Sequence, residues 1–327
     1  MTYRATKMVF EQLFNNEMEK RTARNFLVAM YDNGESVEEI TAAAEVMQSH
    51  SIKLNVPADI QDKLVDIVGT GGDKSGSFNI SSTCSIILAA SGAYVAKHGS
   101  RSITSNSGSA DMLEALGIRL DLNVEQQQKL LNESGFTFLF AGNHHPAMKH
   151  IMPIRKSIDH RTIFNILGPL TNPAGVKKQF VGVYDKAFVV PMAQVLAKTG
   201  STHALVASSL DGLDELSLCA PSFICEINNG IQKEYELDPQ SLGFEKGSLD
   251  DIKGGNAEEN AIITKDILSG KERGPKRDIV LLNCAAALIA NNTVNDFKSG
   301  IELAAELIDN KKAINKLDEI VKVSQAL

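Results

Sequence analysis

The sequence predicts an α/β protein that has a small all-helical N-terminal domain and a larger domain with a mostly parallel central sheet flanked by helices. Three observations favour this fold. The first sixty residues show helical periodicity without strand-like alternation, short apolar runs alternate with helix-like segments from Leu64 onward, and the chain is helical again from about Glu258. Apolar strands separated by helices are typical of a parallel sheet that is covered on both faces.

The N-terminal region has the marks of amphipathic helices. Four apolar side chains fall on one face of the helix predicted for "TKMVFEQLFN": Val9, Phe10, Leu13 and Phe14. Ser36 and Glu39 have the spacing of a capping box, which predicts that another helix begins there. We therefore predict a helical domain over residues 1–63 and an α/β domain over residues 64–327.

Five short apolar runs are the predicted strands: "KLVDIV", "AYVAKH", "FTFLFA", "QFVGVY" and "HALVAS". The helix-like segments between them end at glycines, as helices often do: Gly92, Gly117, Gly135 and Gly200. Ligands of such sheets bind beyond the carboxyl ends of the strands. We therefore expect the loops after these strands to face one crevice.

Composition limits the classes of function. A net charge of -7 argues against a partner that is a nucleic acid or an anionic membrane, which a basic protein would bind. The N-terminus has no apolar signal-peptide core, and the longest apolar runs are too short to span a bilayer. The four cysteines form no C-x-x-C pair, so we expect small buried side chains rather than a disulfide or zinc site. A cytoplasmic enzyme or binding protein fits these features.

The loop after the first predicted strand, "GTGGD", has the character of a phosphate cradle. Glycines let backbone N–H groups approach phosphate oxygens, and the helix that begins near "NISS" adds free N–H groups. The spacing fits neither a Walker loop nor a dinucleotide fingerprint. Asp73 suits a ribose hydroxyl or a metal-held water. The alternative interpretation is a mobile glycine loop capped by serines.

A second loop, "AKHGSRSITSNSGSAD", follows the next strand. Lys97, His98 and Arg101 bring cationic donors close to the strand end, among serines that can orient a ligand. Although such charge runs are usually solvated faces, the mixture with glycines and hydroxyls favours a second anion site.

Two more segments complete the predicted site. "FAGNHHPAMKHIMPIRKSIDHRTIFNILGPLTNPAG" carries Arg161 and several histidines, which match no zinc signature. In a helix only one of Lys149 and Arg155 can face the crevice. "GLDELSL" places Asp214 and Glu215 after the fifth strand, where carboxylates suit Mg²⁺ shared with substrate phosphates. Two anion cradles and a carboxylate pair are the layout expected for a metal-chelated diphosphate that carries a sugar phosphate.

The ordered set "GTGGD…NISS", "KHGSRS…SGSADMLEALG", "HHPAMKHIMPIRK…RTIFNILGPLTNPAG", "GLDELSL" and "GGNAEENA" resembles the anthranilate phosphoribosyltransferase family over nearly the whole chain. The resemblance implies a cytoplasmic homodimer of the nucleoside phosphorylase/phosphoribosyltransferase-like fold, in which we expect residues of about 155–172 to join the helical domain. It also implies Mg²⁺-dependent transfer of the 5-phosphoribosyl group of phosphoribosyl pyrophosphate (PRPP) to the amine of anthranilate, with release of pyrophosphate, in tryptophan biosynthesis. No nucleic-acid or membrane partner is expected.

The family pattern also implies site residues. Those expected to bind PRPP are Gly69, Gly72, Asp73, Ser77, Asn79, Ile80, Ser81, Ser82, Lys97, His98, Gly99, Arg101, Ser105 and Ser109. Those expected around anthranilate are Gly69, His98, Ser100, His145 and Arg155. The expected Mg²⁺ ligands are Ser81, Asp214 and Glu215. No residue is expected to act as a nucleophile.

The sequence departs from the family pattern at the acceptor side. Ser100 stands where "KHGNR" usually has Asn, and Gly142 where Pro is frequent. One alternative is therefore phosphoribosyl transfer to a different aromatic amine. A pyrimidine nucleoside phosphorylase of the related fold would share "GTGGD" but should be longer and lack the Asp-Glu pair. A noncatalytic nucleic-acid-binding relative should be basic and should have lost that pair.

Overall fold

The structure is a computed structural model, and it describes residues 1–73, 75–102 and 107–327. The chain opens with the helices α1 (Tyr3–Phe14), α2 (Lys20–Asn33) and α3 (Val37–Ser49). Helix α3 begins with the predicted capping box, in which the Glu39 backbone N–H donates to Ser36 Oγ and the Ser36 N–H donates to the Glu39 carboxylate. The helical start of the chain is thereby confirmed.

A seven-stranded sheet with the order β3-β2-β1-β4-β5-β6-β7 forms the centre of the molecule. Its strands are β1 (Leu64–Gly69), β2 (Tyr94–Gly99), β3 (Phe136–Phe140), β4 (Lys178–Gly182), β5 (His203–Ser209), β6 (Ser222–Asn228) and β7 (Ile231–Leu237). All pairings among β1 to β5 are parallel, so the carboxyl ends of these strands meet at one edge. The predicted mostly parallel sheet and its five strands are confirmed.

The antiparallel hairpin of β6 and β7 was not among the predicted strands. Its turn is Asn229-Gly230, where both residues have positive φ angles of 47° and 82°. Asn-Gly between two strands is the usual signal of such a turn. The signal was present in "SFICEINNGIQKEYEL", but β7 lies largely exposed, so its polar composition did not resemble the buried strands.

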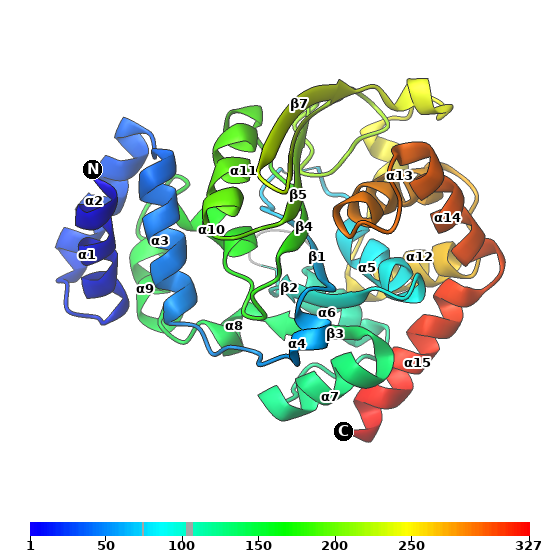
Figure 1. Ribbon diagram of the computed structural model, residues 1–327, viewed down its shortest axis with the longest axis horizontal. Coiled ribbons are helices and arrows are strands. Elements are labelled where there is room, and N and C mark those ends of the chain that lie inside the picture. Colours follow the sequence, from blue (N-terminus) through cyan, green and yellow to red (C-terminus); the bar gives the residue numbers. More distant parts are fainter. Residues whose placement is uncertain (74, 103–106) are drawn as a thin grey trace.

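Helices cover both faces of the sheet (Figure 1). The remaining α-helices are α4 (Ala58–Gln61), α5 (Ile80–Ala90), α6 (Ser109–Ala115), α7 (Val124–Ser134), α8 (Ala141–His144), α9 (Met148–Lys156), α10 (Phe164–Leu167), α11 (Val189–Lys198), α12 (Ala257–Leu268), α13 (Pro275–Ala290), α14 (Phe297–Asp309) and α15 (Lys312–Ala326). Short 3-10 helices are η1 (Gly168–Leu170), η2 (Lys186–Phe188), η3 (Pro239–Leu242) and η4 (Leu249–Ile252). Across the described ranges, no helix is both long and apolar enough to cross a membrane.

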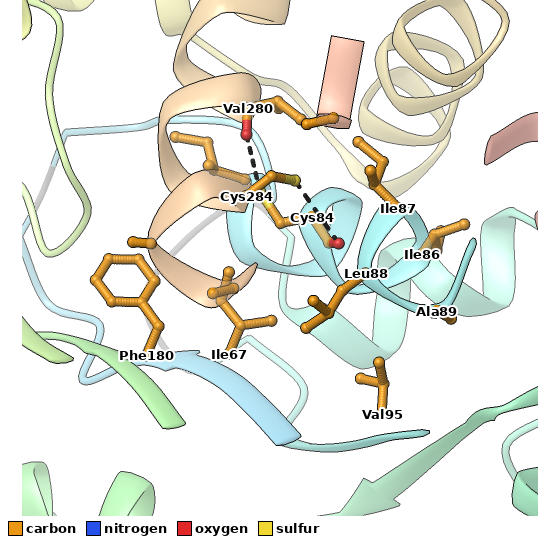
Figure 2. Close-up of a cluster of buried hydrophobic side chains, with 14 of the residues drawn as sticks. Ile67, Cys84, Ile86, Ile87, Leu88, Ala89, Val95, Phe180, Val280 and Cys284 are labelled. Carbon is orange, nitrogen blue, oxygen red and sulfur yellow. Dashed lines mark hydrogen bonds between the residues drawn. The ribbon is translucent and has the colours of Figure 1, made fainter. Parts of the chain in front are cut away.

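One core lies between the sheet and the helices α5 and α13. Figure 2 shows Ile67 of β1 and Phe180 of β4 directed toward these two helices. Cys84 and Cys284 belong to the same core, where the Cys84 thiol donates to the Val280 carbonyl at 3.5 Å. All four cysteines are free thiols, and only Cys219 is partly exposed, which confirms small apolar packing roles for the other three.

A second core joins the N-terminal helices to the opposite face of the sheet. Phe10 and Leu27 from the helical region share one cluster with Val181 of β4, Val206 of β5 and Leu196 of α11. Helix α9 packs against α1 and α2, and α10 packs against α3. These contacts support the expected contribution of residues near 155–172 to the helical part, while the division at residues 63 and 64 stays a prediction.

Candidate active site

The loops that follow β1 and β5 meet at the carboxyl edge of the parallel strands. The backbone N–H of Gly71 donates to Asp214 Oδ2 at 2.6 Å. The glycine loop and the acidic doublet are separated by more than 140 residues in the sequence, yet they form one structure. The predicted crevice therefore brings these two motifs together.

Two glycines make this close approach possible. A Cβ atom built on Gly69 would lie 2.5 Å from Asp214 Oδ2, and one on Gly182 would overlap the Asp214 carbonyl oxygen. Gly69 was predicted from its loop, but Gly182 was missed. The available signal was a glycine inside the apolar strand "QFVGVY", because such glycines often mark a close backbone approach.

Asp214 and Glu215 are buried carboxylates with little compensating charge. Burial and then the neighbouring Asp73 raise the pKa of Asp214 to about 7. Burial and then Asp214 raise the pKa of Glu215 well above its ordinary value, against the opposing effect of Lys97. Two carboxylates held together away from water favour a bound cation, since the cation offsets their repulsion.

The donor set around these carboxylates fits Mg²⁺. The backbone N–H of Ser81 lowers the pKa of Glu215, which places the third expected ligand beside the pair. Asp73 Oδ2 is buried and has no hydrogen-bond partner among the described residues. Within those same residues, no three acidic, histidine or cysteine side chains could hold a metal ion by themselves. An ion here would complete its oxygen coordination with substrate phosphates and water, as Mg²⁺ usually does.

Lys97 lies inside β2, as the predicted strand "AYVAKH" had it, and only 1% of its surface is exposed. Its ammonium group donates to the Ile67 carbonyl at 2.7 Å and to Ser81 Oγ at 3.4 Å. Burial lowers the pKa of Lys97, while the charges of Asp66 and Glu215 raise it. Lys97 is thus a buried cation at the junction of β1, β2 and the start of α5.

The start of α5 has the form of an anion site. The helix begins at Ile80, and the side chain of its N-cap residue, Asn79, does not cap it. Instead the Asn79 amide donates to the Ser107 carbonyl at 3.2 Å, and Asn260 donates to Asn79 Oδ1 at 2.9 Å. N–H groups in the first turn of a helix lack intrahelical partners and attract anions.

Other residues of the predicted donor site lie around this helix start. Ser82 is buried in the first turn of α5, and its hydroxyl has no partner among the described residues. Ser77 forms an isolated bridge with Lys253. Asn260 was missed as an individual site residue, although it lies in the quoted motif "GGNAEENA".

The loop after β2 is only partly described. Gly99 ends β2, and Ser109 is the first residue of α6. Arg101 is engaged by Asp111 at 2.9 Å and by Glu114 at 2.5 Å. Its role at the donor site stays a prediction that requires these exposed ion pairs to exchange for the ligand. Ser105 lies outside the described residues.

His98 and His145 form a pair of buried, neutral rings on the acceptor side, with centroids 5.2 Å apart. Burial, then His145, lower the pKa of His98 to about 3, and burial, then His144, lower that of His145 to about 4. His98 Nδ1 lies 3.1 Å from the Gly168 carbonyl, so the neutral ring donates from Nδ1 and keeps a lone pair on Nε2. Nε2 is buried without a partner among the described residues.

Asp66 is a buried residue of β1 that hydrogen-bonds the backbone of His98. It accepts from the His98 backbone N–H at 3.3 Å and from the Asn172 amide at 2.7 Å. Burial raises the pKa of Asp66 to about 6, against the opposing charge of Lys97. Asp66 and Asn172 were missed as individual site residues, although Asn172 lies in the quoted motif "RTIFNILGPLTNPAG". An aspartate within an apolar strand and an asparagine in a distant loop give no local sign that they meet.

Arg155 and Ser100 are the other expected acceptor residues. Arg155 lies in α9, half-buried over the Phe164 ring at 5.4 Å, and forms no ion pair among the described residues. Burial lowers its pKa. A desolvated guanidinium without a carboxylate partner suits an anionic ligand. Ser100 is exposed, and its hydroxyl donates to the Arg101 carbonyl at 3.1 Å.

Comparisons with known proteins assign the chain to a family. Residues 61–314 match the family described as "Glycosyl transferase family, a/b domain", and residues 1–51 match its helical bundle domain. A protein of Petrotoga mobilis named anthranilate phosphoribosyltransferase is 44% identical over 98% of this chain and 92% of its own length. One of Thermoanaerobacter with the same name is 46% identical over 92% of this chain and 88% of its own length.

The chain belongs to the anthranilate phosphoribosyltransferase family.

Solved structures of anthranilate phosphoribosyltransferases have the same fold. The Thermus thermophilus enzyme aligns with a TM-score of 0.93 at 38% identity, over 99% of this chain and 96% of that one. The Saccharomyces cerevisiae enzyme, solved in complex with PRPP and Mg, aligns with a TM-score of 0.87 at 29% identity over 98% of this chain and 92% of that one. The same yeast enzyme has been solved in complex with 4-fluoroanthranilate.

Proposed function

We propose that this chain transfers the 5-phosphoribosyl group of PRPP to the amine of anthranilate and releases pyrophosphate, as a step of tryptophan biosynthesis. The observation that carries this function is the contact between the glycine loop and the acidic doublet, in which Gly71 donates to Asp214. Anion-binding N–H groups and buried carboxylates in direct contact are what a metal-chelated diphosphate requires.

The donor side has distinct tasks for its residues. N–H groups of the glycine loop and of the first turn of α5 bind the diphosphate oxygens. Ser81, Asp214 and Glu215 would hold Mg²⁺, whose charge would stabilise the departing pyrophosphate. Lys97 offsets the negative charge of Glu215 from within the sheet. Because these groups are fixed before the donor binds, they need not reorganise when the leaving group gains charge.

The acceptor side positions an amine rather than activating a protein nucleophile. Arg155 would pair with the anthranilate carboxylate, and His98 Nε2 offers a lone pair to an amine hydrogen. The bond between ribose C1 and the pyrophosphate oxygen breaks, the amine nitrogen bonds to C1, and one amine proton is released to solvent. Since both histidines are buried and neutral, they do not repel the oxocarbenium-like sugar carbon.

The test is turnover of anthranilate with PRPP, followed through the loss of anthranilate fluorescence with and without Mg²⁺. We expect Mg²⁺-dependent turnover with release of one pyrophosphate for each anthranilate consumed. The absence of turnover in the presence of Mg²⁺ would refute the function.

A second candidate acceptor is a different aromatic amine. It is favoured by Ser100, whose short hydroxyl side chain turns back to the Arg101 carbonyl instead of reaching outward. Turnover of substituted anthranilates and other aromatic amines in the same assay decides between them. A kcat/KM for another amine that exceeds the value for anthranilate would change the proposed substrate.

We further propose that the protein acts as a homodimer in the cytoplasm and without nucleic acid. The side chain of Met8 in α1 is 61% exposed and Met1 is 54% exposed, so the N-terminal helix offers apolar surface to a second copy. The net charge of -7 disfavours phosphate backbones as partners. Light scattering that gives the mass of a single chain at micromolar concentration would refute the dimer.

A further inference from the structure

We propose that Arg161 is a positioning residue of the donor site, which holds the Gly72 carbonyl and thereby fixes the glycine loop in its anion-binding shape. The inference rests on the proposed function, because it assigns Arg161 to the binding of PRPP rather than of the acceptor. Arg161 lies in the connection between α9 and α10. It belongs to a segment that was predicted to contribute to the site, but the sequence assigned it no role there.

The direct contact is a hydrogen bond from Arg161 Nη2 to the carbonyl oxygen of Gly72. Gly72 has a φ angle of 81°, and a Cβ atom there would lie 3.1 Å from the same nitrogen. A trans peptide is planar, so its carbonyl and the following N–H point to opposite sides. Holding the Gly72 carbonyl therefore directs the Asp73 N–H away from Arg161. The guanidinium in this way sets the orientation of a donor in the predicted phosphate cradle.

The guanidinium is itself held by Tyr184, just beyond β4. Its central carbon lies 3.4 Å from the centroid of the Tyr184 ring, a close cation–π stack. The Tyr184 backbone N–H donates to Thr70 Oγ1 at 3.3 Å, and the Thr70 N–H donates to the Gly182 carbonyl at 3.0 Å. The end of β4 thus fixes both the beginning of the glycine loop and the platform on which Arg161 rests.

The connection that carries Arg161 is anchored on the helical part of the molecule. The His160 ring stacks on Tyr31 of α2 at 4.1 Å between centroids, with an interplanar angle of 27°. His160 Nδ1 lies 2.8 Å from the Arg161 carbonyl, within hydrogen-bond distance. Two successive residues therefore connect the glycine loop to helix α2: Arg161 contacts the loop, and His160 contacts Tyr31 of the helix.

The charge of Arg161 is not neutralised by the protein. Glu35, Asp185 and Arg161 line one cavity of about 250 Å³, yet Arg161 forms no ion pair with either acid or with any other described residue. A guanidinium that stacks on a tyrosine ring and donates to a carbonyl, without an acidic partner, keeps its positive charge available to the loop. Arginine, rather than lysine, suits this position because its planar group can stack and donate at once.

The test compares Arg161→Ala and Arg161→Lys with the wild type by titration calorimetry of PRPP with Mg²⁺ and by steady-state kinetics. We expect Arg161→Ala to weaken PRPP binding about tenfold, as loss of one charge-assisted hydrogen bond would. Arg161→Lys should recover only part of this affinity. The KM for anthranilate should stay within about twofold of the wild-type value, a split that a general loss of structure would not produce.

Tyr184 supplies matched variants. Tyr184→Phe keeps the stacking face and should bind PRPP like the wild type, whereas Tyr184→Leu should resemble Arg161→Ala. Arg273→Ala, which removes an exposed arginine paired with Asp309 far from the loop, controls for loss of charge. Thermal unfolding of each variant reports whether it is folded. If Arg161→Ala does not fold, the PRPP affinity of Tyr184→Leu tests the inference instead.

The possible outcomes distinguish failure of the inference from failure of the proposed function. Wild-type protein that binds no PRPP would overturn both. Wild-type protein that binds PRPP and turns over anthranilate, together with an Arg161→Ala variant of equal PRPP affinity, would overturn the inference alone. Equal increases in the KM values of PRPP and anthranilate would also overturn it.

Discussion

Asp214 and Glu215 combine deep burial with like charge, so they should limit stability and support activity at the same time. Asp214→Asn keeps an oxygen that can accept from Gly71 but removes the charge. We expect kcat/KM to fall at least about 100-fold because the metal site loses a ligand. The ligand-free variant should be at least as stable as the wild type to heat, because one repulsive buried charge is gone.

The control for this variant is Asp250→Asn, which neutralises a side chain that is 80% exposed. It should leave both turnover and melting temperature unchanged. Retention of wild-type kcat/KM in Asp214→Asn would remove this residue from the metal site.

Arg155 should act on the acceptor alone. Arg155→Ala removes a half-buried guanidinium that no acidic side chain among the described residues neutralises. We expect the KM for anthranilate to rise tenfold or more, about the value of a charge-assisted pair, while the KM for PRPP changes little. Lys156→Ala, an exposed neighbour, is the control. An unchanged KM for anthranilate would place the acceptor carboxylate elsewhere.

His98 should make the fold sensitive to acid. Burial, then His145, depress its pKa in the folded state to about 3, below the ordinary value of 6.5. Between these two values the unfolded chain binds a proton that the folded chain does not. The free energy of unfolding therefore falls as pH falls from about 6.5 toward 3, by up to about 1.4 kcal/mol per pH unit.

The measurement is urea unfolding at several pH values in this window for the wild type and for His98→Asn, which cannot take up that proton. Protonation of Asp66 has the opposite effect on stability, because the pKa of Asp66 is raised in the folded state. The quantity to compare is therefore the difference in unfolding free energy between the two proteins at each pH. The variant should show the shallower loss of stability on acidification. Identical slopes would mean that His98 does not resist protonation.

Among the structural elements, the ends of β1 and β4 limit the positions that the backbone of the loop after β5 can adopt. A methyl group on Gly182 would overlap the Asp214 carbonyl oxygen, which is backbone and cannot rotate away. We expect Gly182→Ala to destabilise the protein by about 1–3 kcal/mol through overpacking and to reduce turnover. Gly168→Ala is the matched control, since its Cβ would have open space within 4 Å. Equal stabilities in urea would show that the loop has room to move.

Helices and strands were predictable where their signal is local. The capping box of α3 and the apolar runs of β1 to β5 each depend on residues within one segment. The hairpin of β6 and β7 escaped because its Asn-Gly turn was the only local sign, and β7 has no buried face. At the site, the motif residues were named in advance, and Arg161 was among them, but no site role was predicted for Asp66, Asn172 or Arg161. Asn172 is 106 residues from Asp66 and 76 residues from Ala96, and Arg161 is 89 residues from Gly72. Only the fold brings residues so far apart in the sequence into contact.

The whole molecule should respond to its donor as one unit. Because the glycine loop, α5 and the acidic doublet come from separate parts of the chain, a ligand that bridges them binds only the folded state. PRPP with Mg²⁺ at 100 times its dissociation constant should add about 2.7 kcal/mol to stability, or about 4 °C in melting temperature. Ribose 5-phosphate with Mg²⁺, which lacks the diphosphate, should add much less. An unchanged melting temperature with PRPP would contradict a preformed donor site.

The second core has a practical consequence for anyone who wants the α/β part by itself. Phe10 and Leu27 of the first sixty-three residues bury Val181, Val206 and Leu196 of the remainder. A truncated product that starts at Leu64 would present those aliphatic groups to the medium and would tend to precipitate. Its surface would first have to be redesigned with hydrophilic substitutions, whereas the intact polypeptide needs no such repair.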